Sequence, residues 1–93
     1  MTLRFAPRAV SQLADIREYL TVRRPESAEL VRGRIIATIG RLRELSRIGH
    51  AGSVPGTREL RVAGLPYVIV YRIDIGDGDQ LVILGVFHAA QDR

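Results

Sequence analysis

The chain of 93 residues contains no cysteine, no lysine and no tryptophan, and only two histidines. The lack of thiols excludes disulfide bridges and thiolate-bound metals, and two histidines are too few for a recognisable zinc site. We therefore expect no metal and no cofactor. Long apolar runs are also missing, because none approaches the roughly 20 residues that cross a bilayer. Residues 1–5 lack the apolar core of a secretory signal, so we expect a cytoplasmic protein without membrane contact.

The basic residues are all arginines. There are 14 of them against 10 acidic residues, which gives a net charge of +4. Guanidinium groups bind phosphates and carboxylates through paired hydrogen bonds and do not lose their charge. The surplus predicts an acidic partner, either a nucleic acid or an acidic protein. It does not choose between them, because the arginines are spread among apolar positions and form no basic tail.

Two amphipathic helices are expected in the first half of the chain. Pro7 and Pro25 each suit the first turn of a helix, where the missing N–H is not needed. Apolar residues then recur at steps of three and four, and Gly49 is a plausible stop signal. The expected elements are a short strand at 2–5 and helices over about 7–22 and 25–46. The short connection predicts an antiparallel helical hairpin.

The second half changes to the two-residue period of β-strands. Residues 49–56 have the composition of a loop, and residues 76–79 carry a strong hairpin signal. The segment 67–73 is rich in β-branched and aromatic residues and is apolar on both faces until Arg72, which is typical of a central strand. The expected strands cover 58–62, 67–73 and 81–87.

The order β-α-α-β-β-β separates the helices from most of the strands. It predicts a single α+β domain over 1–93, in which a helical hairpin packs on a small antiparallel sheet. The last three strands would form a meander, and the face or rim that the helices leave uncovered would serve a ligand. Tyr67 and Tyr71 share a strand face with Ile69, so we expect them in the core.

Three motifs in the second half form a recognisable combination. They are GTREL at 56–60, PYVIVYRI at 66–73, and VFH at 86–88 followed by Asp92. Together with the two helices ahead of them, they resemble the ParE/RelE superfamily of type II toxins over nearly the whole chain. The resemblance implies a RelE/ParE-like fold and a cognate antitoxin. It also implies one of two activities, since ParE-like members inhibit DNA gyrase and RelE-like members cut messenger RNA on the ribosome.

If the chain is a nuclease, its catalytic candidates are Arg58, Arg61, Arg72 and His88. The arginines would stabilise the charge on the scissile phosphate, and His88 or Glu59 would carry protons. Each of these side chains also fits a structural role. The arginines could pair with carboxylates on neighbouring elements, and His88 could close an apolar strand through hydrogen bonds.

Two departures from the RelE-like pattern weigh against nuclease activity. Val68 stands where RelE-like nucleases carry an arginine, and Ala89 and Ala90 follow His88 where those enzymes end in an arginine or a His-Tyr pair. The spacing of His88 and Asp92 instead resembles ParE-like members. The sequence therefore favours gyrase inhibition by protein binding, without enzymatic activity. The alternatives are a ribosome-dependent messenger RNA endonuclease and a non-toxic basic binding module.

The antitoxin is expected to present an acidic, amphipathic segment that folds as it wraps the toxin. Its apolar residues would dock beside the helical hairpin, and its carboxylates would meet arginines. The expected contact residues are Arg41, Arg43 and Arg47 at the end of the second helix, and Arg58 and Arg61 on the strand that follows.

Overall fold

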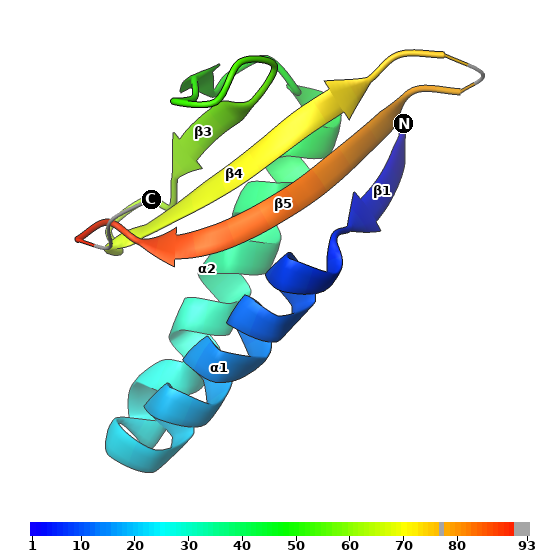
Figure 1. The fold of residues 1–93 in the computed structure, drawn as a ribbon. Helices are drawn as coiled ribbons and strands as arrows, with labels where there is room; N and C mark the ends of the chain where they lie inside the picture. Colours follow the sequence, from blue (N-terminus) through cyan, green and yellow to red (C-terminus); the bar gives the residue numbers. More distant parts are fainter. Residues whose placement is uncertain (77, 91–93) are drawn as a thin grey trace.

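A computed structural model describes residues 1–76 and 78–90 as two helices and a five-stranded sheet (Figure 1). The elements are β1 (Thr2–Phe5), α1 (Pro7–Arg23), α2 (Pro25–Glu44), β2 (His50–Ala51), β3 (Arg58–Arg61), β4 (Tyr67–Asp74) and β5 (Gln80–His88). The strands lie in the order β1-β5-β4-β3-β2, so β3, β4 and β5 form the expected meander. The predicted α+β class is confirmed. Within the described residues, no helix has the length and apolar character needed to cross a membrane.

The prediction of a wholly antiparallel sheet is wrong, because β1 pairs with β5 in the parallel direction. Strand β5 has nine residues, and the N-terminal segment occupies the edge that β4 leaves open. The register pairs Phe5 with Ile83, and the N–H of the next residue, Ala6, donates to the Ile83 carbonyl at 2.9 Å. The parallel direction therefore leads the chain straight from β1 into α1.

Two boundaries in the middle of the chain also differ from the sequence prediction. Helix α2 ends at Glu44 and not at 46, and the expected loop at 49–56 contains the two-residue strand β2. Strand β2 extends the sheet, since His50 pairs with Glu59. The element order is thus β-α-α-β-β-β-β, with one short strand more than the sequence predicts.

A buried tyrosine binds the backbone of the segment that follows the helix. The Tyr71 hydroxyl donates to the Ser46 carbonyl at 2.8 Å and accepts the Gly49 N–H at 3.0 Å. These bonds satisfy backbone groups outside the helix. A Cβ built on Gly49 would lie 2.5 Å from the Tyr71 hydroxyl oxygen. Gly49 is therefore needed for close approach to Tyr71, four residues beyond the helix cap at Leu45, and not as the helix stop signal.

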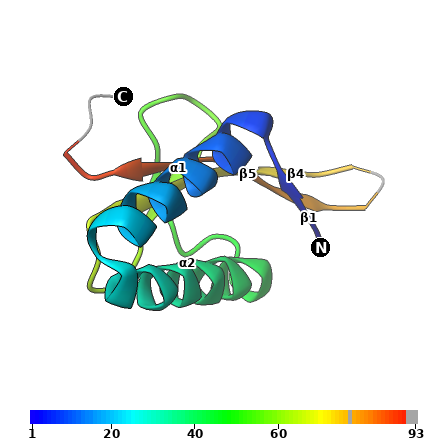
Figure 2. The same ribbon diagram turned by 90° about the horizontal axis from the view of Figure 1, so that it is seen from below.

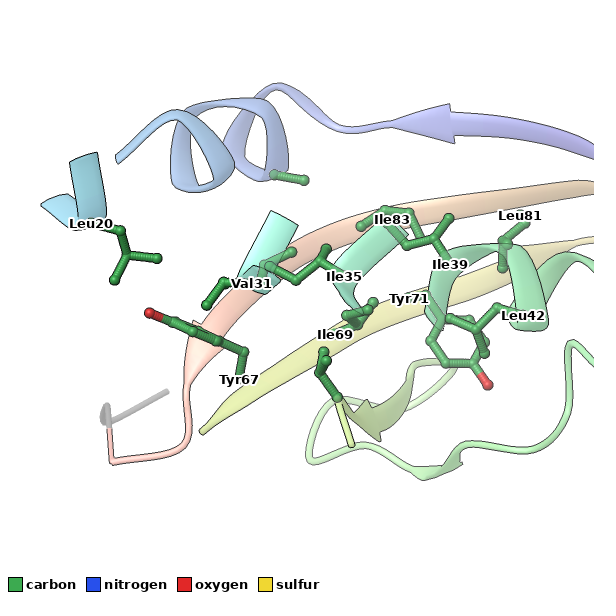
Figure 3. Packing of buried hydrophobic residues seen from close by; sticks show 13 residues of the cluster. Leu20, Val31, Ile35, Ile39, Leu42, Tyr67, Ile69, Tyr71, Leu81 and Ile83 are labelled. Carbon is green, nitrogen blue, oxygen red and sulfur yellow. The ribbon is translucent and has the colours of Figure 1, made fainter. Parts of the chain in front are cut away.

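The core lies between the sheet and the helices, and Figure 3 shows its side chains. Tyr67, Ile69 and Tyr71 of β4 are buried there with exposed fractions of 9%, 0% and 0%, which confirms their predicted place in the core. The apolar stripe of α2 meets them (Val31, Ile35, Ile39 and Leu42), together with Leu81, Ile83 and Val86 of β5. Alternation along β4 therefore assigns its other face, with Val68, Val70 and Arg72, to the opposite side of the sheet.

Helix α1 crosses the outer edge of β5, whereas α2 lies beneath the sheet (Figure 2). Where β1 ends, the Gln12 side chain takes the place of a strand partner, since its Oε1 accepts the Val86 N–H at 2.8 Å. At the first turn of α1, the Arg8 guanidinium lies 4.8 Å from the centre of the Phe87 ring. The edge of β5 is thus covered along its length. Within residues 1–76 and 78–90, no helix packs on the sheet face turned away from α2.

Candidate partner-binding surfaces

Three exposed arginines stand on the sheet face turned away from α2, which we call the open face. Val82 of β5 pairs with Arg4 of β1 on one side and with Arg72 of β4 on the other. The three residues therefore form one row across three neighbouring strands. Arg61 of β3 pairs with Val68 further along the same face. With strands about 4.8 Å apart, the Cα atoms of Arg4 and Arg72 are about 10 Å apart.

The arginines of the open face have weak partners within the chain. Arg72 Nε lies 2.8 Å from Asp74 Oδ1, but both side chains are nearly half exposed. Exposed ion pairs of this kind contribute about 0–1 kcal/mol, so a partner's carboxylate can replace Asp74. Arg4 Nη1 donates to the Gln80 side chain at 3.3 Å. Beneath these polar groups lie the buried side chains of Val82 and Phe87, which give the face an apolar floor.

Arg58 has a different position from the other strand arginines. It pairs with Tyr71, on the helix side of the sheet. Its Nη1 donates to the Gly49 carbonyl at 2.8 Å and to the Arg47 carbonyl at 3.3 Å. Arg58 and Tyr71 therefore hold the segment 46–49 together. The structure gives Arg58 a structural role that the sequence left open.

His88 lies at the far end of the sheet from Arg72. It stands opposite Tyr67, and the two rings meet edge to face with centroids 5.7 Å apart. The Ala90 N–H donates to its Nδ1 at 3.2 Å. Tyr67 and Arg72 are five residues apart on β4, which is about 16 Å, and they face opposite sides of the sheet. His88, which pairs with Tyr67, is therefore remote from Arg72.

The nuclease candidates therefore do not all converge. Arg58 points toward the segment 46–49, Arg72 and Arg61 stand on the open face, and His88 packs against the ring of Tyr67. General acid–base cleavage of a phosphodiester needs a proton carrier and an anion stabiliser around one phosphate. Arg58 and His88 lie away from the exposed arginines of the open face. Glu59, the other candidate proton carrier, pairs with Val70 and so faces the same side as Arg61 and Arg72, but it is only 6% exposed. No accessible proton carrier among the candidates therefore stands beside these arginines.

The predicted antitoxin contacts are also divided between two regions. Arg41 and Arg43 are exposed in the last turn of α2, where cations are favoured by the helix dipole, and Arg47 is exposed three residues beyond the helix. Arg58 adjoins them through the Arg47 carbonyl. Arg61, by contrast, belongs to the open face and donates from Nε to the carbonyl of Leu65 at 3.2 Å.

An apolar groove of about 480 Å³ runs between α1 and α2, and we call it the inter-helix groove. Its floor consists of core residues from both helices (Leu13, Leu20, Val31, Ile35 and Ile39). At its rim stand Arg17 and Arg32, together with Phe5 and Ile36, which are 40% and 52% exposed. The groove can therefore take an apolar surface from a partner and meet its carboxylates with guanidinium groups.

Sequence reasoning missed Arg4 and the inter-helix groove. Arg4 reaches the open face only because β1 pairs with β5, some 80 residues away, and no local signal marks that pairing. The apolar stripes of α1 and α2 are visible in the sequence, but the groove that remains between the two packed helices is not. Among the described residues, no three histidine, aspartate or glutamate side chains lie close enough together to hold a metal ion.

Known proteins match this chain along nearly its full length. The family model of the ParE toxin of the type II toxin–antitoxin system parDE matches residues 3–93. Y4kP of Sinorhizobium fredii, a protein named as a toxin, is 36% identical over 89 residues, which cover 96% of this chain and 88% of that protein. The family model covers nearly the whole chain, and the relative is more than a third identical over almost the same length, so both matches show common family membership.

Two solved structures share the fold. A chain of the chromosomal ParDE system from P. aeruginosa superimposes with a TM-score of 0.83 at 24% identity, over 95% of each chain. The YoeB/ParE toxin from Agrobacterium tumefaciens superimposes with a TM-score of 0.62 at 17% identity, over 95% of this chain and 98% of that one. The chain thus belongs to the ParE toxin family of type II toxin–antitoxin systems, and the family implies a cognate antitoxin.

Proposed function

We propose that this toxin inhibits DNA gyrase by binding it, in the cytoplasm, and that it does not cut nucleic acid. The observation that carries the proposal is the separation of Arg58, Arg72 and His88, together with the burial of Glu59, which leaves no accessible proton carrier beside the exposed arginines. A toxin that lacks a cleavage site would act by binding its target through its surface. ParE-like members of the superfamily, which the sequence resembles, inhibit gyrase in this way.

The open face is the surface that we assign to the target. Arg4, Arg61 and Arg72 present three guanidinium groups above an apolar floor. Guanidinium groups form paired, charge-assisted hydrogen bonds with carboxylates, and the weak internal partners of Arg4 and Arg72 cost little to exchange. An acidic protein surface is therefore the partner that this face fits.

We assign the inter-helix groove to the antitoxin. An amphipathic helix fits an apolar groove by inserting residues spaced at three and four positions. Arg32 is close to Glu29 at 3.8 Å, but the side chains are 60% and 86% exposed, so Arg32 can turn to an acidic partner. The part of the antitoxin that continues past the groove would meet Arg41 and Arg43 in the last turn of α2 and Arg47 just beyond it.

Inducing the toxin in cells without its antitoxin tests the proposal. Gyrase inhibition predicts filamentous cells and a DNA-damage response, with full-length messages. His88→Ala should keep this toxicity, and the double variant Arg4→Ala/Arg72→Ala should lose it. Messages shortened within codons in the ribosomal A site, in a manner that His88→Ala abolishes, would contradict the proposal. Normal growth on induction would favour the non-toxic binding module.

A further inference from the structure

A second hollow, of about 420 Å³, opens between α1 and the end of the sheet where β5 finishes. Tyr19, Tyr67 and His88 bring three aromatic rings to it, and Asp15 adds a carboxylate. Its other lining residues are Gln12, Ile16 and Val86. We call it the aromatic pocket. It is distinct from the open face and, apart from Ile16, shares no lining residue with the inter-helix groove.

The rings form a corner and not a stack. Tyr67 and His88 stand at 83° to each other with centroids 5.7 Å apart, so they make two perpendicular walls. Tyr19 follows Asp15 by one helical turn on α1, which places both side chains on the same side of the helix. Aromatic faces carry partial negative charge and attract cations, and a neighbouring carboxylate adds to that attraction.

Burial, and to a smaller extent Tyr19, raise the pKa of Tyr67 above its ordinary value of 10.0, so the phenol adds no charge to the pocket. Contacts of another kind within the chain favour a cation. Guanidinium groups already lie over aromatic rings at two places in this chain. Arg8 is 4.8 Å from the centre of the Phe87 ring, and Arg23 is 4.4 Å from that of Tyr19. One face of the Tyr19 ring is therefore already occupied, and an incoming guanidinium would meet its other face together with Tyr67 and His88.

We infer that the aromatic pocket binds the guanidinium group of an arginine side chain presented by a protein partner. A guanidinium is planar and weakly hydrated, so it stacks on a flat ring more readily than a compact ammonium does. Its fork of N–H donors can reach the Asp15 carboxylate at the same time. The pocket thus prefers a basic group, whereas the open face and the inter-helix groove prefer acidic ones. This inference does not depend on the identity of the toxin's target.

Titration of the isotope-labelled full chain with N-acetyl-arginine methylamide, followed by NMR, tests the inference. The expected result is saturable shifts at Asp15, Tyr19, Tyr67 and His88, with weaker responses to the matching lysine derivative and none to the norleucine derivative. Free L-arginine should bind more weakly than the blocked derivative, because its own carboxylate is repelled by Asp15. Tighter binding of free arginine would instead indicate a site for the amino acid itself and would overturn the assignment to a protein partner.

Variants make the test specific. Asp15→Asn should weaken the blocked arginine about fivefold, since an exposed cation–carboxylate contact of this kind contributes roughly 1 kcal/mol. Glu18→Gln removes an exposed carboxylate of the same helix outside the pocket and should change nothing. Both sites are exposed, and circular dichroism will confirm that the variants fold. Equal affinities for Asp15→Asn and wild type, or an equal response to the lysine derivative, would overturn the inference.

Discussion

Replacing Tyr71 with phenylalanine removes one oxygen atom and tests how the segment after α2 is held. The hydroxyl accepts the Gly49 N–H at 3.0 Å and donates to the Ser46 carbonyl at 2.8 Å, and the residue is fully buried. A typical hydrogen bond contributes about 1 kcal/mol net, and a buried donor left without a partner costs about 1–3 kcal/mol. We therefore expect Tyr71→Phe to lower the free energy of unfolding by about 2–3 kcal/mol.

For a domain of this size, such a loss should lower the melting temperature by about 10–20 °C. Thermal and urea unfolding followed by circular dichroism will measure it, and hydrogen exchange should show faster exchange of the Gly49 N–H. Tyr19→Phe is the matched control, because Tyr19 is 54% exposed and its loss of a hydroxyl should change stability by less than about 0.5 kcal/mol. Equal stabilities of the two variants would refute the reasoning.

Further predictions concern close packing, the covered edge, pH and the groove. Gly49→Ala should cost about 1–3 kcal/mol in urea unfolding, because its Cβ would lie 2.5 Å from the Tyr71 hydroxyl oxygen, whereas Gly33→Ala meets nothing within 4 Å and should not destabilise. Gln12→Leu leaves the Val86 N–H without its acceptor and should cost about 1–3 kcal/mol, with faster exchange at that amide. The raised pKa of Tyr67 means that the unfolded chain loses its proton first as pH rises past 10.0. Stability should therefore fall above that pH, and less steeply in Tyr67→Phe. Arg17→Glu/Arg32→Glu should weaken antitoxin binding about tenfold or more in calorimetry, and an unchanged affinity would exclude the inter-helix groove as the antitoxin site.

Local patterns were enough to predict most elements. The prolines at positions 7 and 25 and the three- and four-residue periods placed both helix starts, and α1 ends within one residue of the prediction. Runs of β-branched and aromatic residues, apolar on both faces, placed β4 and β5, and the two-residue period of a strand put Tyr67 and Tyr71 on one face with Ile69. These features depend on neighbours in the chain, which a periodic pattern records directly.

The features that failed depend on distant residues. Nothing near Arg4 indicates that β1 will lie parallel to β5, and nothing near Ser46 indicates that Tyr71, 25 positions further on, will bind its carbonyl. The candidate site shows the same limit. The sequence identified Arg58 as a functional candidate, but its backbone acceptors at Arg47 and Gly49 exist only in the folded chain. Asp92, part of the family-like ending, lies outside the described residues.

The central claim is that the toxin acts by binding through the open face. Its most direct test is inhibition of supercoiling by purified DNA gyrase, with reconstituted translation run in parallel to detect cut messages. The account predicts that wild type and His88→Ala inhibit gyrase equally, and that Arg4→Ala/Arg72→Ala is weaker by about tenfold or more. The control Arg23→Ala/Arg24→Ala, which removes the same charge from the hairpin tip, should inhibit like wild type. Ribosome-dependent cutting that His88→Ala abolishes, with gyrase unaffected, would contradict the claim.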